Sequence, residues 1–334
     1  MNNVIIYCSS KDELNVATLM YVEILNEALN FGQKLQVVNS ISKVKNNNIV
    51  LTIRWIDFLR VKLNKPSAKC LNWFQGVVPE ESFMKNGSKL KYLVLSFCEF
   101  IVIKMSIYNF FVSQEMYLHY KKKYNYRKNN FYIMPCFNMK LNENIHLKDN
   151  KKSLVYAGSM TKWQKVESVL KVYMELKSID PDFELTILTR QLERSKVLLK
   201  KNKLLDEVLC KQVKMEDMPN ELIKYKYGFL LRDNITVNKV ACPTKMNSYL
   251  ACGVIPIYSE NIGDFKEVFG NMKYTIRVDD SSDCIEIAKE ILQFDKRNLF
   301  YEDLYLEYKN LFEKFYNKTK YVFEIREKIK FLII

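Results

Sequence analysis

The sequence has few of the residues from which protein metal sites are built. It contains two histidines in 334 residues, and its eight cysteines stand singly, without a C-x-x-C pair. A zinc centre is therefore not expected, because such centres need clustered Cys and His ligands. Unpaired cysteines within apolar runs are typical of buried free thiols in a reducing compartment, which predicts a cytoplasmic protein.

Several other signals are missing. Neither G-x-x-x-x-G-K-[ST] nor G-x-G-x-x-G occurs, so there is no P-loop and no standard dinucleotide fingerprint. The amino end lacks the basic region of a signal peptide and is expected to form a first β-strand. The segment Leu90 to Val112 most suggests a membrane span, but Glu99 and Lys104 interrupt it. Such charges cost about 2.5–3.5 kcal/mol each near the centre of a span, so we expect a buried or membrane-facing helix there.

What the chain does have is a globular composition with excess positive charge. Hydrophobic residues make up 48% and charged residues 27% of the sequence, which excludes wholesale disorder. The length indicates about two domains. The 52 Lys and Arg residues exceed the 38 Asp and Glu residues, for a net charge of +14. A chain this basic is expected to meet nucleic acid, a phosphorylated small molecule or an acidic membrane surface.

The order of apolar runs predicts two α/β domains. Short apolar strands alternate with helical periodicity in residues 1–140, and the alternation restarts in residues 153–303 after a polar, aperiodic linker at 141–152. Residues 304–334 are expected to form a C-terminal helix that can pack back on the first domain. Alternation of this kind predicts parallel sheets covered on both faces, with ligands in a cleft between the domains, beyond the carboxyl ends of the strands.

The first candidate motif lies at the start of the second domain. Leu154-Val-Tyr-Ala is an apolar strand, and Gly158 and Ser159 form a small turn before a helix that contains Lys162 and Lys165. Glycine permits close backbone approach, and a helix amino end favours anions, so this turn could hold a phosphate. A plain strand–turn–helix junction with solvated lysines would have the same sequence.

The second candidate motif is longer. An apolar strand leads to Arg232, a polar loop with Asn238 follows, and Pro243, Thr244 and Lys245 begin a helix that ends at Gly253. Two cations converging on a helix amino end could clamp a diphosphate. A surface loop with two solvated cations is the alternative.

These motifs resemble those of a known family. The run Pro243-Thr-Lys-Met-Asn-Ser-Tyr-Leu-Ala-Cys-Gly-Val-Ile-Pro-Ile257 resembles the donor-binding helix of GT-B glycosyltransferases, in particular glycosyltransferase family 4. Tyr156-Ala-Gly-Ser-Met-Thr-Lys-Trp-Gln164 is similar to that family's first turn in the carboxyl-terminal domain. The segments Trp73–Glu81, Phe111–Met116 and Tyr132–Phe137 are similar to the amino domain of bacterial polysaccharide members.

The resemblance implies a fold and an activity. It implies two Rossmann-like domains that face each other across a cleft, the first binding an acceptor and the second a nucleotide sugar. The activity would be transfer of a sugar from a UDP- or GDP-linked donor to a glycan or lipid-linked acceptor, in surface polysaccharide or glycoconjugate synthesis. Members usually retain the anomeric configuration and need no metal, so no cofactor is expected.

Residue roles follow from the same resemblance. Lys245 and Thr244 would contact the donor diphosphate, assisted by Arg232 and Lys162, with Gly158 and Ser159 in the turn that faces it. Cations there would offset charge on the departing nucleotide, so Arg232 and Lys245 are the predicted catalytic residues.

Ser248 is a departure from the family pattern. Members commonly have Glu at this position, where it holds the donor ribose, and serine could give one hydrogen bond but not the charge-assisted pair of a carboxylate. Asn247 or Asn238 could bind the ribose instead. The departure also leaves open a non-catalytic partner subunit of a glycosyltransferase complex. A sugar-nucleotide epimerase of the same fold is a further alternative.

On the acceptor side, Glu80 and Glu81 are expected at the end of a strand, where they could orient a hydroxyl or simply form a solvated turn. His119 is expected at the surface. The basic, aromatic stretches Tyr117–Arg127 and Tyr308–Lys330 suit the anionic inner face of a membrane, where the protein could lie peripherally. Nucleic acid is not expected, because no binding signature accompanies them.

Overall fold

The computed structural model of the chain describes residues 4–10, 14, 16–145 and 151–333. They form two compact units. Unit 1 comprises Met1–Asn138, Lys239–Cys242 and Asn317–Ile334, and unit 2 comprises Met139–Asn238 and Pro243–Tyr316. The expected linker contains no helix or strand among its described residues, and its residues 146–150 lie outside them.

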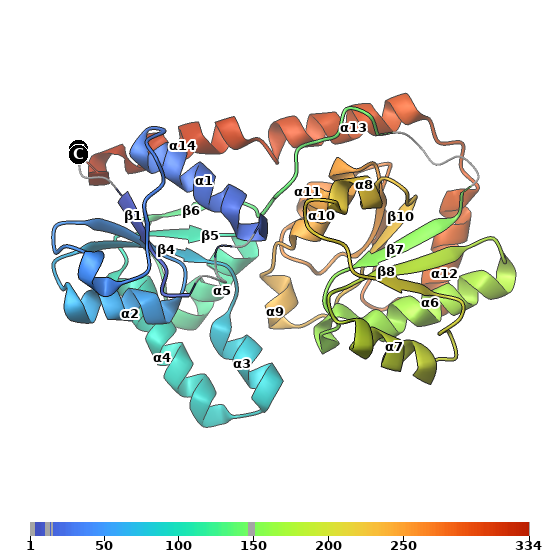
Figure 1. The fold of residues 1–334 in the computed structure, drawn as a ribbon, viewed down its shortest axis with the longest axis horizontal. Coiled ribbons are helices and arrows are strands. Elements are labelled where there is room, and N and C mark those ends of the chain that lie inside the picture. The colour runs from blue at the N-terminus through green and yellow to red at the C-terminus, as the bar shows by residue number, and fades with distance from the viewer. Residues whose placement is uncertain (1–3, 11–13, 15, 146–150, 334) are drawn as a thin grey trace. The chain divides into compact units, whose positions relative to one another are not determined.

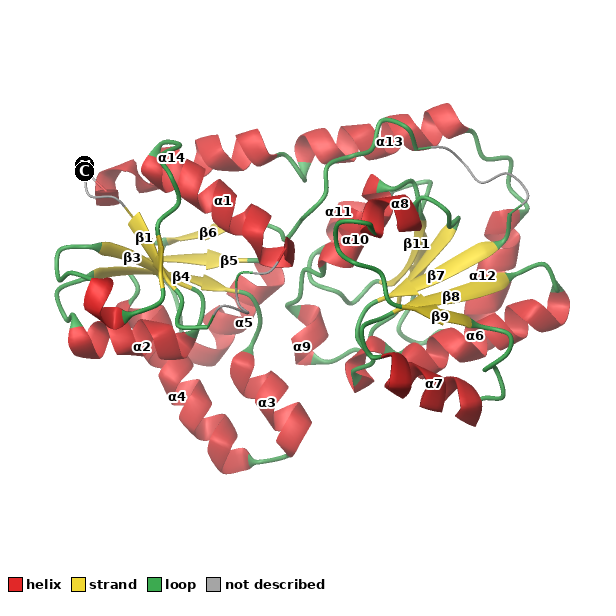
Figure 2. Cartoon of the chain, viewed as in Figure 1, coloured by secondary structure: helices red, strands yellow, loops and turns green. Residues whose placement is uncertain are grey.

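Unit 1 is built on a parallel sheet of six strands in the order β2-β1-β3-β4-β5-β6. The strands are β1 (Val4–Tyr7), β2 (Val37–Val38), β3 (Ile49–Thr52), β4 (Lys69–Phe74), β5 (Tyr108–Phe111) and β6 (Phe131–Ile133). Every residue of β1, β3 and β5 is buried, as expected for strands covered on both faces. Figure 2 shows helices on both sides of this sheet.

The helices of unit 1 include one that the sequence pattern does not predict. They are α1 (Val16–Asn30), α2 (Trp55–Asn64), α3 (Val78–Asn86), α4 (Lys89–Met105), α5 (Gln114–Tyr124) and α14 (Lys318–Ile333), with a 3-10 turn at Ile41–Lys43. The unpredicted helix is α3, which has Pro79 in its first turn, where proline needs no hydrogen-bonding N–H. Glu80 and Glu81 therefore lie in the first turn of a helix, and their predicted place at the end of a strand is wrong.

Unit 2 contains a second parallel sheet, with the strand order β12-β11-β10-β7-β8-β9. Its strands are β7 (Ser153–Ala157), β8 (Glu184–Leu188), β9 (Leu209–Lys211), β10 (Tyr227–Leu230), β11 (Ile255–Ser259) and β12 (Ile276–Val278). The chain starts in the middle at β7, proceeds to one edge and returns to place β10 on the other side of β7. This reversal is a topological switch point, where doubly wound sheets bind ligands.

The helices of unit 2 alternate with its strands. They are α6 (Val166–Ile179), α7 (Leu192–Lys201), α8 (Met218–Leu222), α10 (Thr244–Ala251), α11 (Phe265–Phe269), α12 (Cys284–Asp295) and α13 (Tyr301–Lys314), with a 3-10 turn at Lys162–Gln164. The short helix α9 (Thr236–Lys239) stands where the sequence pattern predicts a polar loop. The helix predicted to begin at Pro243–Lys245 is α10, which starts at Thr244 and ends at Ala251, two residues before Gly253.

The long C-terminal helix consists of two segments, α13 in unit 2 and α14 in unit 1. Within unit 1, α14 packs on α1. Lys318 Nζ lies 2.9 Å from a carboxylate oxygen of Glu27, and the Arg326 guanidinium donates to the Glu27 carbonyl at 3.0 Å.

Several tyrosines of the two basic stretches face the cores, whereas Phe323 in the second stretch is 65% exposed, so membrane contact by these stretches stays a prediction. Tyr120 and Tyr126 in the first stretch are fully buried, as is Tyr308 in the second. These tyrosines alternate with lysines because each helix buries one stripe of side chains and exposes the opposite stripe to solvent. Within the described ranges, no helix is both long enough and apolar enough to cross a membrane.

Candidate functional site

The two predicted motifs of unit 2 meet at its switch point. Gly158 directly follows β7, and Arg232 lies two residues after β10, the strand that pairs with β7. Because parallel strands end at the same edge of a sheet, the two residues lie on the side where such folds bind ligands. Lys245, in the first turn of α10, completes the group.

The Lys245 ammonium is held by neutral partners. Its Nζ donates to Gln164 Oε1 at 2.7 Å and lies 4.3 Å from the centroid of the Tyr156 ring. Burial, and then the positive charge of Arg232, hold the pKa of Lys245 well below its ordinary value. A cation that is desolvated and repelled in this way gains much from a bound anion.

Arg232 is buried in the same region. Its side chain reaches Asn238 Oδ1 at 3.5 Å, and its backbone N–H donates to the Ser259 hydroxyl at 2.9 Å. Burial lowers the pKa of Arg232 to about 10, so the guanidinium stays charged at neutral pH. Its buried Nε has no hydrogen-bond partner in the described part of the chain. Unsatisfied buried donors of this kind are rare and indicate a functional position.

Gly158 lies directly against the Lys245 ammonium. A Cβ at this position would collide with Nζ of Lys245 and would lie 2.5 Å from its Cε. The backbone N–H of Gly158 donates to the Leu188 carbonyl at 2.9 Å, which ties the turn to β8. Only a residue without a side chain lets Lys245 lie directly on this turn.

The remaining predicted diphosphate contacts are more open. Lys162 is exposed, while Ser159 and Thr244 are half-buried. The Ser159 hydroxyl lies 3.2 Å from the Thr161 hydroxyl and accepts from the Gln164 amide at 3.3 Å. Gln164 thus connects this turn with Lys245.

The predicted ribose contacts are engaged within the protein. The Asn238 amide donates to the carbonyls of Asp233 at 2.8 Å and Trp163 at 3.3 Å. Asn247 pairs with the backbone of Met139, accepting at 2.8 Å and donating at 3.1 Å. The Ser248 hydroxyl donates to the Thr244 carbonyl one helical turn earlier, at 3.1 Å. These groups shape the site more directly than they offer hydrogen bonds to a ligand.

A pocket of about 570 Å³ lies beside this turn in unit 2. Its walls are residues that follow Gly158, one side of α7, and Asp233 next to Arg232. Cations predominate over carboxylates among its charged residues, which are Lys162, Lys165, Arg194, Lys201, Glu167 and Asp233. The pocket therefore suits an anionic molecule too large for a single phosphate.

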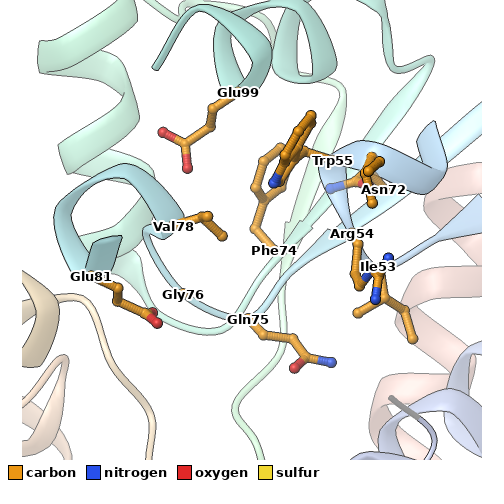
Figure 3. Close-up of a pocket in the computed structure, with 11 residues that line it drawn as sticks. Ile53, Arg54, Trp55, Asn72, Phe74, Gln75, Gly76, Val78, Glu81 and Glu99 are labelled. Carbon is orange, nitrogen blue, oxygen red and sulfur yellow. The ribbon is translucent and has the colours of Figure 1, made fainter. Parts of the chain in front are cut away.

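Unit 1 has a pocket of similar size, about 580 Å³, at the carboxyl ends of β3 and β4. Figure 3 shows the carboxyl groups of Glu81 from α3 and Glu99 from α4 on one side and Arg54 on the other. Burial raises the pKa of both Glu81 and Glu99. Carboxyl groups with raised pKa values in a pocket are suited to hydrogen bonding with hydroxyls.

Glu80 points into a different environment. Its Oε1 lies 2.8 Å from Lys123 Nζ and 3.4 Å from His119 Nε2. Burial acts to raise the pKa of Glu80, but hydrogen bonds from His119 and Lys123 outweigh it and lower the pKa. The His119 side chain is half-buried, less exposed than the sequence predicts for a surface histidine. Of the two predicted acceptor residues, only Glu81 lines the pocket.

Sequence reasoning assigned no role to several residues of these sites. In unit 2 they are Gln164 and Tyr156, which hold Lys245, and Tyr249, whose hydroxyl accepts from the Ala157 N–H at 3.1 Å. In unit 1 they are Arg54 and Glu99. Of these residues only Glu99 has a signal in the sequence, because a charged residue inside an otherwise apolar helix indicates a buried polar contact. Across the described residues, no group of His, Cys, Asp and Glu could hold a metal ion.

Comparisons with known proteins connect this architecture to glycosyltransferases. No family model and no curated protein matches the sequence. The structure, however, is similar to the lipopolysaccharide outer core galactosyltransferase WaaB, with a TM-score of 0.67 and 11% identity over 99% of this chain and 100% of that one.

Two further solved structures are larger. The complex of S. aureus TarM with UDP has a TM-score of 0.62 and 12% identity, over 86% of this chain and 56% of that chain. The GtfA/B complex has a TM-score of 0.59 and 11% identity, over 87% and 58%. This chain thus spans just over half the length of those two. The structural neighbours are GT-B glycosyltransferases of family 4, and the chain has the GT-B fold that its motifs imply.

Proposed function

We propose that the chain is a glycosyltransferase that moves a sugar from a UDP- or GDP-linked donor to a glycan or lipid-linked acceptor, with retention, in surface polysaccharide or glycoconjugate synthesis. The observation that carries the proposal is a pair of cations, the buried Arg232 and the half-buried Lys245, beside the glycine turn at the switch point of unit 2. The similarity to TarM, whose structure contains UDP, supports a nucleotide as part of the ligand.

The donor would bind to unit 2 through its diphosphate. Lys245 and Arg232 would supply positive charge, Gly158 would allow close approach, and the Thr244 and Ser159 hydroxyls would donate hydrogen bonds. Lys162 would act from the rim of the neighbouring pocket. Asn238 would position Arg232, since its Oδ1 faces the guanidinium.

The chemistry requires a stabilised leaving group. The bond between the anomeric carbon and the diphosphate breaks with its electron pair on the diphosphate, and the acceptor oxygen bonds to that carbon and gives its proton to an oxygen of the departing diphosphate. Arg232 and Lys245 would offset the charge that builds on the diphosphate. The acceptor would bind in the pocket of unit 1, with Glu81 as a hydroxyl partner, Glu99 holding the wall of the pocket through its tyrosine and lysine partners, and Glu80 positioning α3 against α5.

Product analysis with the purified chain tests the activity. We expect a nucleoside diphosphate and a glycosylated acceptor when a UDP- or GDP-sugar and a lipid-linked saccharide pool are supplied, detected by mass spectrometry. A nucleotide sugar of unchanged mass but altered stereochemistry, formed without acceptor, would identify an epimerase instead.

A partner subunit without catalysis is the second candidate. Ser248 supports it, because its hydroxyl is bonded to the Thr244 carbonyl and no carboxylate stands at this position. The similarity to the GtfA/B complex shows that the fold occurs in an assembly. Turnover that appears only after a second chain is added would favour this candidate, whereas turnover by the chain alone would exclude it.

Gly158→Ala is expected to weaken donor binding about tenfold, because the new methyl group displaces the Lys245 ammonium. Backbone strain at φ 156° should also lower the free energy of unfolding by about 1 kcal/mol. Gly32→Ala is the matched control, since Gly32 has φ 78° but nothing lies near its missing Cβ. Calorimetric titration with UDP- and GDP-sugars should separate the two variants. Equal donor affinity in both would contradict a role for the turn.

A further inference from the structure

Helix α4 has apolar residues on both its inner and its outer side. Leu95, Glu99 and Val102 face the body of unit 1 and are buried. A helix that covers a sheet is expected to be polar on its opposite side. Here Leu93 and Phe97, one turn apart, are each 63% exposed.

Helix α3 also exposes apolar side chains. The two helices pack together as a hairpin, which turns at Gly87 with φ 66° and extends away from the sheet of unit 1 (Figure 1). We call the exposed apolar set the hairpin face; its members are Phe83, Met84, Leu90, Leu93, Val94 and Phe97. Other exposed apolar side chains, such as Leu63, Val197 and Phe323, come from separate elements, as is normal for single surface residues.

The tip of the hairpin carries charge of one sign. Between Glu81 and Glu99 the sequence contains Lys85, Lys89 and Lys91 and no acidic residue. All three lysines are exposed. On α4 the exposed residues Leu90, Leu93, Val94 and Phe97 recur at helical spacing and so form one stripe. An apolar stripe with a purely basic tip complements a surface that is apolar inside and anionic outside, which is the composition of an anionic lipid leaflet.

We propose that the hairpin face binds the anionic surface of a lipid bilayer. The apolar side chains enter the boundary between headgroups and acyl chains, and Lys85, Lys89 and Lys91 lie at the phosphate groups. The hairpin lies in the interface and does not span the bilayer. The inference goes beyond the proposed function, because this surface binds lipid whether or not unit 2 binds a donor. It places membrane contact on α3 and α4, away from the two aromatic stretches.

Vesicle flotation with the full chain tests the proposal. We expect binding to vesicles of phosphatidylcholine with phosphatidylglycerol, and at least about tenfold weaker binding to phosphatidylcholine alone. Leu93→Ser with Phe97→Ser should weaken binding to the mixed vesicles at least about tenfold. Lys89→Glu with Lys91→Glu should abolish the preference for the anionic lipid. Phe323→Ser is the matched control, since Phe323 is 65% exposed but lies on α14.

Each outcome separates this proposal from its alternatives. Absence of wild-type binding to the mixed vesicles, or equal loss in the hairpin and control variants, would overturn it. A dimer in sedimentation velocity that the hairpin substitutions dissociate, without vesicle binding, would make the face a contact between copies of the chain. Because the changed side chains are exposed, circular dichroism and melting temperature should match wild type. Donor affinity in calorimetric titration should be unchanged in the hairpin variants. Vesicle binding should be unchanged in Lys245→Met. Failure of the lipid proposal can therefore be told apart from failure of the proposed function.

Discussion

Lys245→Met is expected to weaken binding of a nucleoside diphosphate by about tenfold to a hundredfold. A hydrogen bond to a charged group contributes about 1.5–3 kcal/mol, and each 1.4 kcal/mol corresponds to a factor of ten. Methionine keeps the length of the side chain but removes its charge. Gln164 Oε1 still accepts from the Tyr156 hydroxyl at 3.1 Å, so the surrounding turn should keep its arrangement.

The same substitution should stabilise the chain in the absence of ligand. Because the folded pKa of Lys245 lies below its ordinary value of 10.5, the folded state binds fewer protons than the unfolded state between those two pH values. The free energy of unfolding therefore rises with pH in that window and reaches its full value above 10.5. In Lys245→Met this dependence disappears, and the melting temperature below the window should exceed that of wild type by about 2 °C or more.

Lys289→Met is the control for this prediction. Lys289 is an exposed lysine on α12, outside the pocket of unit 2. It should change neither nucleotide affinity nor the pH dependence of melting. If Lys245→Met binds nucleotides as wild type does, Lys245 is a structural residue and the donor site lies elsewhere.

Glu99→Ala should have the largest effect on unit 1. Its carboxylate accepts from the hydroxyls of Tyr120 at 3.0 Å and Tyr124 at 2.7 Å, and from Lys123 Nζ at 3.2 Å. Removing one partner of a buried charged network costs about 3–5 kcal/mol, because the groups left behind stay buried without it. Glu99→Gln keeps an acceptor oxygen and should lose less.

Fluorescence can isolate this effect in unit 1. The three tryptophans are Trp55, Trp73 and Trp163, and only Trp163 lies in unit 2. In a Trp163→Phe background, denaturation followed by tryptophan emission therefore reports unit 1. Burial raises the folded pKa of Glu99, so its contribution to stability falls as pH rises from 4.5 through the folded pKa. Glu99→Gln should not show that fall. Equal stability of Glu99→Ala and wild type would contradict a structural network at this carboxylate.

Most strands and helices could be predicted from the sequence, because their apolar periodicity is strong and their ends carry clear signals. Helix α3 could not, since Val78–Asn86 has no clear apolar stripe. Propensity alone does not place such a segment, and contact with α4 decides it. The burial of most tyrosines in the two aromatic stretches could not be predicted for a related reason. Lys and Tyr alternate on helices that bury the rings, and a sequence does not show which face turns inward.

The site could be predicted as a set of residues but not as an arrangement. Strand order brings Gly158 and Arg232 to one edge, as a parallel sheet requires. The contact of Lys245 with Gln164 joins residues 81 positions apart, so spacing in the sequence gives no sign of it. The internal hydrogen bonds of Asn238, Asn247 and Ser248 depend on backbone positions that only the folded chain defines.

Calorimetric titration of the wild-type chain with UDP and GDP, in parallel with uridine and guanosine, tests the central claim most directly. The claim is that the buried Arg232 and the half-buried Lys245 together hold a diphosphate. We therefore expect one of the two diphosphates to bind, and its matching nucleoside to bind at least about tenfold more weakly, because the nucleoside lacks the charges that the cations recognise. No binding of either diphosphate, or equal affinity for diphosphate and nucleoside, would contradict the account.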